Sequence, residues 1–267
     1  MTAARTLPGQ PAALSADRPP LEVRIFPRSA PEANLRAVRL ARRLLPQGGH
    51  LIDFGCGTGT HLSTLRGKAE IAAGYDLSDA ALDRLATDMA ELKGAAPVSL
   101  LGPEFRDLER HVAASGPADL ILCLSGVLCH IQSRAARCDM LRALSGLLAP
   151  ETGRLLISVP NRRRYFVAEQ RAAGPGAEEI RYTRVTAQGS DEMSFRLYDP
   201  DSLADELRDG GFAVEAMAAQ SLFSEAMTVR SPPLRALDWF AAPFMPARYG
   251  YDITGVARPL SAGNTPA

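Results

Sequence analysis

The sequence predicts an α/β fold in which a doubly wound, mostly parallel sheet carries helices on both faces. Between residues 50 and 160, short apolar runs alternate with longer segments of helical periodicity. This alternation is typical of consecutive strand–helix–strand units. A right-handed crossover in each unit places the loops that follow the strands on one edge of the sheet. We therefore expect a ligand site at that edge, where the first such loop is rich in glycine.

Size and charge restrict the number of domains and the kinds of partner that the protein can have. At 267 residues and 28.6 kDa, the chain has the length of one domain with an insertion. Lysine and arginine balance aspartate and glutamate at 30 each. Because proteins that bind nucleic acid usually carry a basic excess, this balance argues mildly against such a partner without excluding it. No apolar run is long enough to cross a membrane and no secretory signal is visible, which predicts a cytoplasmic protein with no membrane partner.

The N-terminal part of the chain divides into two predicted segments. Residues 1–20 are rich in alanine, proline and small polar residues, and we expect them to be disordered. Leu21–Phe26 alternates apolar and charged residues, which fits a short strand or an extended lid segment. Ala30–Leu45 has apolar residues at i, i+3, i+4 spacing and predicts an amphipathic helix. Residues 21–46 are thus expected to form an N-terminal helix and lid of a single domain over 21–260.

A glycine-rich loop joins the first predicted strand to a short helix. The apolar run Leu51–Phe54 leads into Gly55, Gly57 and Gly59, and Thr60–Leu65 has the pattern of a helix. Glycine adopts positive φ angles and has no Cβ, so such a loop turns sharply and lets a ligand approach its backbone. The first N–H groups of the following helix favour an anion. This order of strand, loop and helix predicts a nucleotide-like ligand.

The spacing of the glycines separates two ligand classes. A dinucleotide loop of the G-x-G-x-x-G type would have its last glycine where this chain has Thr60. Here the glycines occupy alternate positions and Asp53 precedes the first by two residues. The pattern resembles the acid-x-G-x-G-x-G motif I of class I S-adenosylmethionine (SAM) dependent methyltransferases. The next predicted strand, within Ile71–Ser78, ends in an acid, Asp76, which is expected to bind a ribose diol in doubly wound folds.

The resemblance covers about residues 50–217 and the last strand. It implies a Rossmann-like sheet of seven strands with an antiparallel last strand, SAM as cofactor and S-adenosylhomocysteine as product. Asp53 is expected to hold the amino-acid part of SAM, Asp76 the ribose and Leu77 the adenine, while residues 58–60 approach the carboxylate. The expected cofactor-binding residues are Asp53, Gly55, Cys56, Gly57, Thr58, Gly59, Asp76, Leu77, Glu104, Phe105, Leu124 and Ser125.

Relatives usually place an acid after the third strand, where it bonds the exocyclic amine of adenine. Glu104 and Asp107 are two alternatives for that acid, and a solvated surface acid is the third reading of either. Ser78 is the expected N-cap of the helix after the second strand. The remaining expected elements are the helices Asp79–Lys93, Arg134–Leu148 and Leu203–Arg208, the strands Pro97–Leu101, Ala118–Leu124, Arg154–Val159, Phe212–Met217 and Tyr251–Ala257, and a strand or hairpin arm over Glu192–Tyr198.

Acceptor-side residues are expected where the fourth and fifth strands end, because ligands bind at that edge of open α/β sheets. His130 is the candidate general base, with a structural histidine that bonds the backbone as the alternative. Arg162, Arg164 and Tyr165 are the candidate substrate-binding residues. Arginine makes forked bonds to carboxylate and phosphate groups, although a solvated turn is an equal alternative. Residues 221–249 are rich in aromatic residues and proline, and we expect this insertion to roof the substrate pocket.

The resemblance implies methyl transfer from SAM to an O, N or S nucleophile of a small-molecule metabolite by in-line displacement. Methylation of tRNA or another RNA is one alternative, and a SAM-binding regulatory protein without catalysis is another. Adenine N6 and glutamine are unlikely acceptors, because an Asn/Asp-Pro-Pro-aromatic motif is missing at Leu124–Val127. The spacing of cysteines and histidines predicts no metal site. The acceptor stays open, as does the choice between monomer and homodimer.

Overall fold

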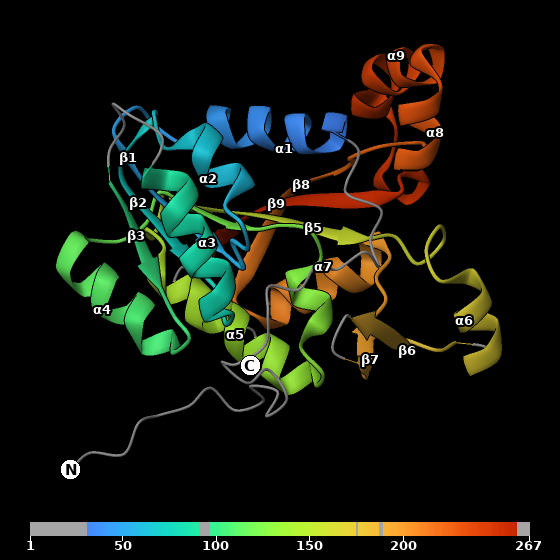
Figure 1. Ribbon diagram of the computed structural model, residues 1–267, viewed down its shortest axis with the longest axis horizontal. Coiled ribbons are helices and arrows are strands. Elements are labelled where there is room, and N and C mark those ends of the chain that lie inside the picture. The colour runs from blue at the N-terminus through green and yellow to red at the C-terminus, as the bar shows by residue number, and fades with distance from the viewer. Residues whose placement is uncertain (1–30, 91–96, 175, 187–188, 261–267) are drawn as a thin grey trace.

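The computed structural model describes residues 31–90, 97–174, 176–186 and 189–260. Its main sheet has seven strands in the order β3-β2-β1-β4-β5-β9-β8 (Figure 1). These strands are β1 (Gly49–Phe54), β2 (Ala69–Tyr75), β3 (Val98–Leu101), β4 (Leu120–Cys123), β5 (Arg154–Pro160), β8 (Phe212–Ala219) and β9 (Asp252–Pro259). A separate hairpin pairs β6 (Glu179–Thr186) with β7 (Gly189–Arg196).

Strand direction confirms the predicted sheet. Neighbouring strands from β3 through β5 are parallel, and β9 runs antiparallel to both β5 and β8. The last strand is therefore reversed, as the sequence resemblance implied. In the β1–β2 register Phe54 pairs with Tyr75, so the residues that follow, Gly55 and Asp76, leave the sheet side by side. The predicted glycine loop and the predicted ribose acid are thus neighbours because of this register.

Helices cover both faces of the sheet, as expected for a doubly wound fold. One face carries α1 (Pro31–Leu44), α2 (Thr60–Leu65) and α3 (Asp79–Ala90), and the other carries α4 (Phe105–Ser115), α5 (Arg134–Leu147) and α7 (Pro200–Asp209). Alternate strand residues serve the two faces: Leu51 packs on the α1 side and Ile52 on the α5 side.

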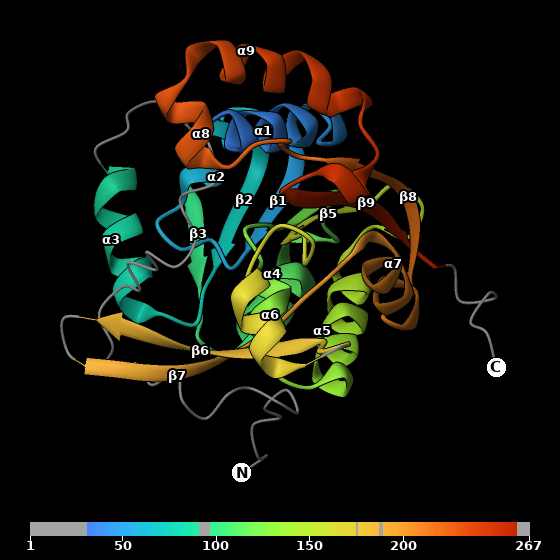
Figure 2. The same ribbon diagram turned by 90° about the vertical axis from the view of Figure 1, so that its right-hand side faces the viewer.

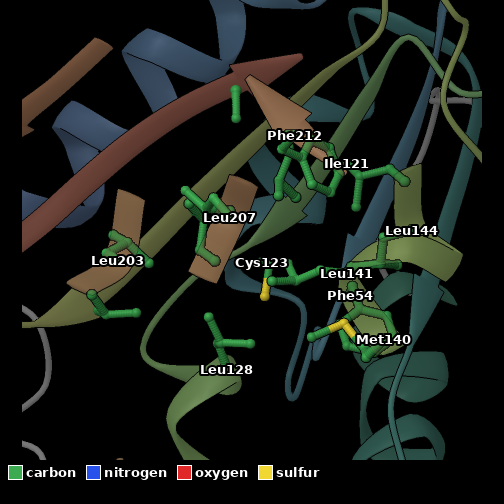
Figure 3. Close-up of a cluster of buried hydrophobic side chains, with 14 of the residues drawn as sticks. Phe54, Ile121, Cys123, Leu128, Met140, Leu141, Leu144, Leu203, Leu207 and Phe212 are labelled. Carbon is green, nitrogen blue, oxygen red and sulfur yellow. The ribbon is translucent and has the colours of Figure 1, made fainter. Parts of the chain in front are cut away.

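The larger core lies between the sheet and the helices α4, α5 and α7. Figure 3 shows Ile121 and Cys123 of β4 beside Leu141 of α5, with Leu207 of α7 and Phe212 of β8 nearby. All five side chains are buried. Complete burial of such a side chain contributes about 1.5–3 kcal/mol, so this layer fixes the edge from which the functional loops emerge.

The described part of the chain contains elements that the sequence did not predict. The helices α4 and α6 (Val167–Ala173) and the strand β6 have no counterpart among the expected elements. Helix α4 buries Phe105 and Leu108 but few other residues, so its apolar signal is short. The expected caps are present, since Ser78 Oγ accepts the Ala81 N–H at 3.3 Å and Asp199 caps α7. The predictions for residues 1–30 and 91–93 lie outside the described residues.

Two inserted segments flank the carboxyl edge of the sheet. The insertion, between β8 and β9, contains α8 (Glu225–Arg230), α9 (Pro232–Ala241) and the 3-10 helices η2 (Ala242–Phe244) and η3 (Ala247–Tyr249). Figure 2 faces this edge and shows α8 and α9 beside α1 on one side and the hairpin on the other. Arg36 Nη1 of α1 bonds Asp238 Oδ2 of α9 at 2.7 Å, and Arg39 lies 4.1 Å from the centre of the Trp239 ring. These contacts hold the insertion on α1. No helix in the described ranges is long and apolar enough to span a membrane.

Candidate functional site

The glycine loop after β1 is shaped by three residues with positive φ, at 80° for Gly55, 51° for Gly57 and 74° for Gly59. A Cβ on Gly55 would lie 2.4 Å from Val127 Cγ2, and one on Gly59 would lie 2.1 Å from Leu85 Cδ1. A Cβ on Gly57 would meet no atom within 4 Å. Gly55 and Gly59 therefore allow the loop to pack against its neighbours, whereas Gly57 leaves the backbone open to a ligand.

Asp76 sits against the same loop. Its Oδ2 accepts the Gly57 N–H at 2.8 Å, and its Oδ1 accepts the Ser78 N–H at 3.0 Å. Burial raises the pKa of Asp76 above its ordinary value, against the lowering effect of these backbone bonds. Each carboxylate oxygen has two acceptor sites, so Asp76 retains capacity for further donors. Its side chain can hold hydroxyl groups while it remains bound to the loop.

Asp53 lies deeper, at 1% exposure, and its Oδ2 has no hydrogen-bond partner among the described residues. Burial, with repulsion from Asp76, raises the pKa of Asp53 to about 7. The nearest basic group is His61, whose Nδ1 lies 3.9 Å from Asp53 Oδ2. Because burial lowers the pKa of His61 to about 4, this contact is not an ion pair at neutral pH. His61 Nε2 also lacks a hydrogen-bond partner among the residues described. The region beneath the glycine loop thus holds two unsatisfied buried polar atoms, which is unusual.

The residues predicted at the adenine lie beyond Asp76. Leu77 is half-buried. The Phe105 ring is 6% exposed and packs edge-on at 6.3 Å from the rings of both Phe54 and Tyr75. Glu104 is exposed and precedes α4 with an extended backbone, whereas Asp107 in the first turn is bonded by Arg110. Of the two alternative acids, Asp107 already has a partner.

At the end of β4 the backbone turns sharply. Leu124 is buried on the α1 side, and Ser125 is exposed with φ 59°, a value uncommon for a residue other than glycine. Its N–H donates to Ser158 Oγ at 2.9 Å. This turn leads into η1 (Val127–His130), which ends in the predicted base. The His130 ring is half-buried and meets the Phe195 ring edge-on at 5.1 Å between centroids.

Ring contacts extend from His130 across the hairpin to the end of β5. The ring centroids of Phe195 and Phe166 are 5.4 Å apart, and those of Tyr165 and Tyr251 are 5.6 Å apart. The Tyr165 hydroxyl donates to the carboxylate of Asp252, and burial raises the pKa of that carboxyl to about 7. In the β5–β9 pairing Asp252 stands opposite Pro160, the last residue of β5, so it opens β9 at the carboxyl edge.

The arginine run after β5 splits into separate directions. Arg162 Nη2 donates to the Ala177 carbonyl at 2.9 Å. Arg164 Nη2 donates to the Tyr249 carbonyl at 3.3 Å, and its guanidinium lies 5.5 Å from the centre of the Tyr251 ring. The two predicted substrate-binding arginines therefore do not converge on one point. Tyr165 lies between them in sequence and joins the aromatic contacts instead.

A sequence profile described as a methyltransferase domain matches residues 28–217, which is more than half of the chain. The chain belongs to this methyltransferase family. It is a SAM-dependent methyltransferase, and S-adenosylmethionine is its cofactor. No curated protein matches the sequence.

Solved structures that are similar to this methyltransferase share its fold at low sequence identity. The CcbJ methyltransferase from Streptomyces caelestis is 15% identical, with a TM-score of 0.63 over 87% of this chain and 91% of that chain. A SAM-dependent methyltransferase from Clostridium acetobutylicum is 13% identical, with a TM-score of 0.59 over 86% and 91%. CalS10 from Micromonospora echinaspora is 18% identical, with a TM-score of 0.52 over 85% and 91%.

Sequence reasoning missed His61, Asn161 and Asp252 of this methyltransferase. Asp252 has a visible signal, since it is an acid directly before an apolar strand at the edge where ligands bind. Asn161 has no such signal, because its partners Arg248 and Gly250 lie far along the chain. His61 has none either, because its burial depends on how α2 packs against the sheet. Among the described residues, no group of three or more histidine, cysteine, aspartate or glutamate side chains is placed to hold a metal ion.

Proposed function

We propose that this methyltransferase transfers the methyl group of SAM to an O, N or S nucleophile of a small-molecule metabolite by in-line displacement. The observation that carries the proposal is the covering of the carboxyl edge by the insertion on one side and the hairpin on the other (Figure 2). Such coverage suits a small acceptor better than a long nucleic acid. CalS10, which shares the fold, is an amino pentose methyltransferase involved in calicheamicin biosynthesis.

For the cofactor, we assign each part of SAM to residues of the glycine-loop region. The open backbone at Gly57 suits close approach of the ligand, and Asp76 has free acceptor capacity for the ribose hydroxyls. The unsatisfied Oδ2 of Asp53 suits the ammonium of the amino-acid part, directly or through a water molecule. Exposed Thr58 faces the same region and is assigned to the carboxylate. These features fit SAM without displacing the packing of Gly55 and Gly59.

The adenine end is assigned to residues on either side of β3. Leu77 follows Asp76 and is half-buried, so it can contact one face of the base. Glu104 is the favoured acid for the exocyclic amine, because Asp107 is already bonded by Arg110. The ring of Phe105 lies in the core, so this residue supports the base through its neighbours and its backbone. Leu124 and Ser125 close the site from β4.

Catalysis requires little of the protein beyond alignment. When bound, SAM supplies a methyl group activated by its positively charged sulfur. The turn at Ser125 and the aromatic contacts around Phe195 would align the acceptor and exclude water. Alignment of this kind contributes up to about 7–11 kcal/mol. An acceptor that must lose a proton also needs a base, and His130 and Asp252, which both join the aromatic contacts, are the candidate proton acceptors.

The alternatives make different predictions. A methyltransferase that acts on tRNA would use the arginine run as a track for phosphates, but Arg164 is turned toward Tyr249 and Tyr251. A regulatory protein would bind SAM without turnover. The experiment is a methyl-transfer assay with labelled SAM against a metabolite panel and bulk tRNA. Transfer to a metabolite supports the proposal, whereas transfer to tRNA alone, or tight binding without any transfer, contradicts it. A cytoplasmic location and a monomeric or homodimeric state stay predictions.

A further inference from the structure

An open groove lies just after the end of β5. Its volume is ≈ 500 Å³. One wall is the turn after β5 with helix α6, and the other is the segment that leads into β6. The groove is lined by Arg162, Arg163, Val167, Gln170, Arg171, Gly174, Gly176 and Ala177. We call it the arginine groove.

The lining of the arginine groove is cationic. Three of its residues are arginines and none is an acid. Arg163 and Arg171 are exposed, and neither forms an ion pair with any residue of the described ranges. Asp199 is an acid near this lining: burial tends to raise its pKa, but hydrogen bonds from Ser202 and the charges of Arg162 and Arg163 lower that pKa below its ordinary value. The Asp199 carboxylate is already engaged at 2.9 Å by the N–H of Ser202 at the start of α7. The lining itself therefore carries three positive charges and no negative charge, with Asp199 as a neighbouring acid.

Hydrogen bonds fix the backbone that carries Arg162 and Arg163. Gln170 Nε2 of α6 donates to the carbonyls of Arg162 at 2.5 Å and Tyr165 at 2.7 Å, so the helix is fastened to the turn. The Arg163 N–H donates to Asn161 Oδ1 at 3.1 Å. Arg162 itself is anchored on Ala177 across the groove. The guanidinium groups thus project from an ordered backbone, which reduces the entropy lost when a ligand binds.

The arginine groove begins close to the expected methyl-transfer site. Arg162 follows Pro160, the end of β5, by two residues, a span of about 7 Å at most. Pro160 Cδ lies only 3.2 Å from the position that a Cβ on Gly126 would occupy, so β5 ends against the turn after β4. That turn carries Ser125, which we place beside the reacting groups. The groove lining therefore begins two residues after the strand end that packs against this turn.

We propose that the arginine groove binds a carboxylate or phosphate group of the methyl acceptor, which makes the acceptor an acidic small molecule. The proposal rests on the proposed function and names the substrate class for it. Arginine binds such oxyanions through two parallel N–H bonds, and Arg163 and Arg171 offer unpaired forks for this. The sequence predicted Arg164 as a substrate-binding residue, but Arg164 does not line the groove. We assign that role to Arg171, which does.

A small acid fits the groove better than RNA does. Its volume lies within the range of small-molecule pockets, about 300–1,000 Å³. Nonspecific RNA binding needs positive charges that follow several phosphates along a strand, whereas the free arginines here lie in one groove of a chain with zero net charge. Binding of RNA is therefore the outcome that would overturn the proposal.

The test compares two double variants with the same loss of charge. Arg163→Gln with Arg171→Gln removes the unpaired groove arginines, and Arg43→Gln with Arg84→Gln removes exposed arginines of α1 and α3. Calorimetry measures binding of inorganic pyrophosphate and of citrate to each protein saturated with S-adenosylhomocysteine. We expect at least tenfold weaker binding of one or both probes in the groove variant and less than a twofold change in the control. Melting temperatures verify that both variants are folded.

Several results would overturn the proposal. One is that the wild-type protein binds neither pyrophosphate nor citrate. Another is that probe affinity falls equally in both double variants. The third is a salt-dependent affinity for bulk tRNA that only the groove variant loses. S-adenosylhomocysteine binding is measured on the same samples and should be unchanged in every variant. If the wild-type protein binds S-adenosylhomocysteine but neither anion, the groove proposal fails while the methyltransferase assignment stands. If it binds the anions but not S-adenosylhomocysteine, the cofactor assignment is what fails.

Discussion

The two halves of the site are built differently. The cofactor half, to which we assign SAM, consists of β1, β2 and β3 with the loops that follow them. Hydrogen bonds of Asp76 and Tyr75 join these loops, and Val127 packs against Gly55. The acceptor half joins residues 125–130, 161–171, 195–199 and 247–252, brought together by side-chain contacts. Backbone geometry defines the first half and long-range packing defines the second. Substitutions should therefore affect cofactor binding and acceptor chemistry separately.

The largest expected effect concerns the acceptor half. Replacing a general base should lower kcat by about 10²–10⁴-fold with little change in cofactor affinity. The variants His130→Gln and Asp252→Asn remove the two candidate proton acceptors, and the larger fall identifies the base. Steady-state kinetics with an acceptor found in the screen give the measurement. If neither variant loses tenfold in kcat while both bind S-adenosylhomocysteine normally, no base operates in this half.

Two glycine substitutions separate packing from ligand approach in the cofactor half. Gly59→Ala drives a methyl group into Leu85 and should destabilise the fold by about 2–4 kcal/mol. Gly57→Ala meets no neighbour and should cost only about 1 kcal/mol for its left-handed backbone. Urea unfolding measures the loss of stability in each variant. Titration with S-adenosylhomocysteine measures the change in cofactor affinity. Gly57→Ala should weaken binding at least tenfold; unchanged affinity would contradict the assignment of the ligand to this open backbone.

Asn161 tests whether the acceptor half depends on one buried side chain. Its Nδ2 donates to the carbonyls of Arg248 at 3.1 Å and Gly250 at 2.8 Å, which attach the end of the insertion to β5. Asn161→Asp removes the donor and places a carboxylate against these oxygens. We expect a loss of about 1–3 kcal/mol of unfolding free energy and higher KM for the acceptor. Affinity for S-adenosylhomocysteine should change less than twofold, and a larger change would show that the halves are coupled.

Proton release on cofactor binding is the smallest expected effect. The pKa of Asp53 is about 7 in the folded protein against an ordinary 3.8, so the folded state holds this proton more tightly than the unfolded chain. The stability from this group is complete below about pH 4 and is lost as the pH rises through about 7. An ammonium beside Asp53 favours the ionised carboxylate, so affinity for S-adenosylhomocysteine should rise a few-fold from pH 6 to pH 8.

Calorimetry in buffers of different ionisation enthalpy measures the proton released. Asp53→Asn is the control, because it keeps the shape of the side chain and cannot ionise. Its affinity should be nearly flat across this range. A wild-type affinity that is equally flat would contradict the placement of the ammonium beside Asp53.

The geometry of the cofactor half was predictable because its signals are local in sequence. Three alternate glycines, Asp53 and an acid at the end of the next strand define the loop, and the β1–β2 register then places them together. The capping acid Asp199 was predictable for the same reason. His61 shows the limit, because its burial beside Asp53 depends on how α2 packs against the sheet.

The acceptor half was predictable only in part. His130 and the arginine run were visible as residues after strands, but the direction of each arginine was not. Arg164 contacts Tyr249 and Tyr251, which lie more than 80 residues later in the chain. Arg171 was missed because α6 is a short helix with no buried residue and therefore no apolar pattern. The Tyr165–Asp252 contact likewise depends on β9 pairing with β5.

The most direct test of the account is calorimetric titration of the wild-type protein and Asp76→Ala with S-adenosylhomocysteine, with NAD as the competing ligand class. Asp83→Ala, an exposed acid on α3, is the matched control. We predict micromolar binding of S-adenosylhomocysteine, no binding of NAD, and a loss of roughly 2–4 kcal/mol in Asp76→Ala alone, since two hydroxyl donors lose a charged acceptor. Unchanged affinity in Asp76→Ala, or a preference for NAD, would contradict the assignment of the glycine loop and Asp76 to the cofactor.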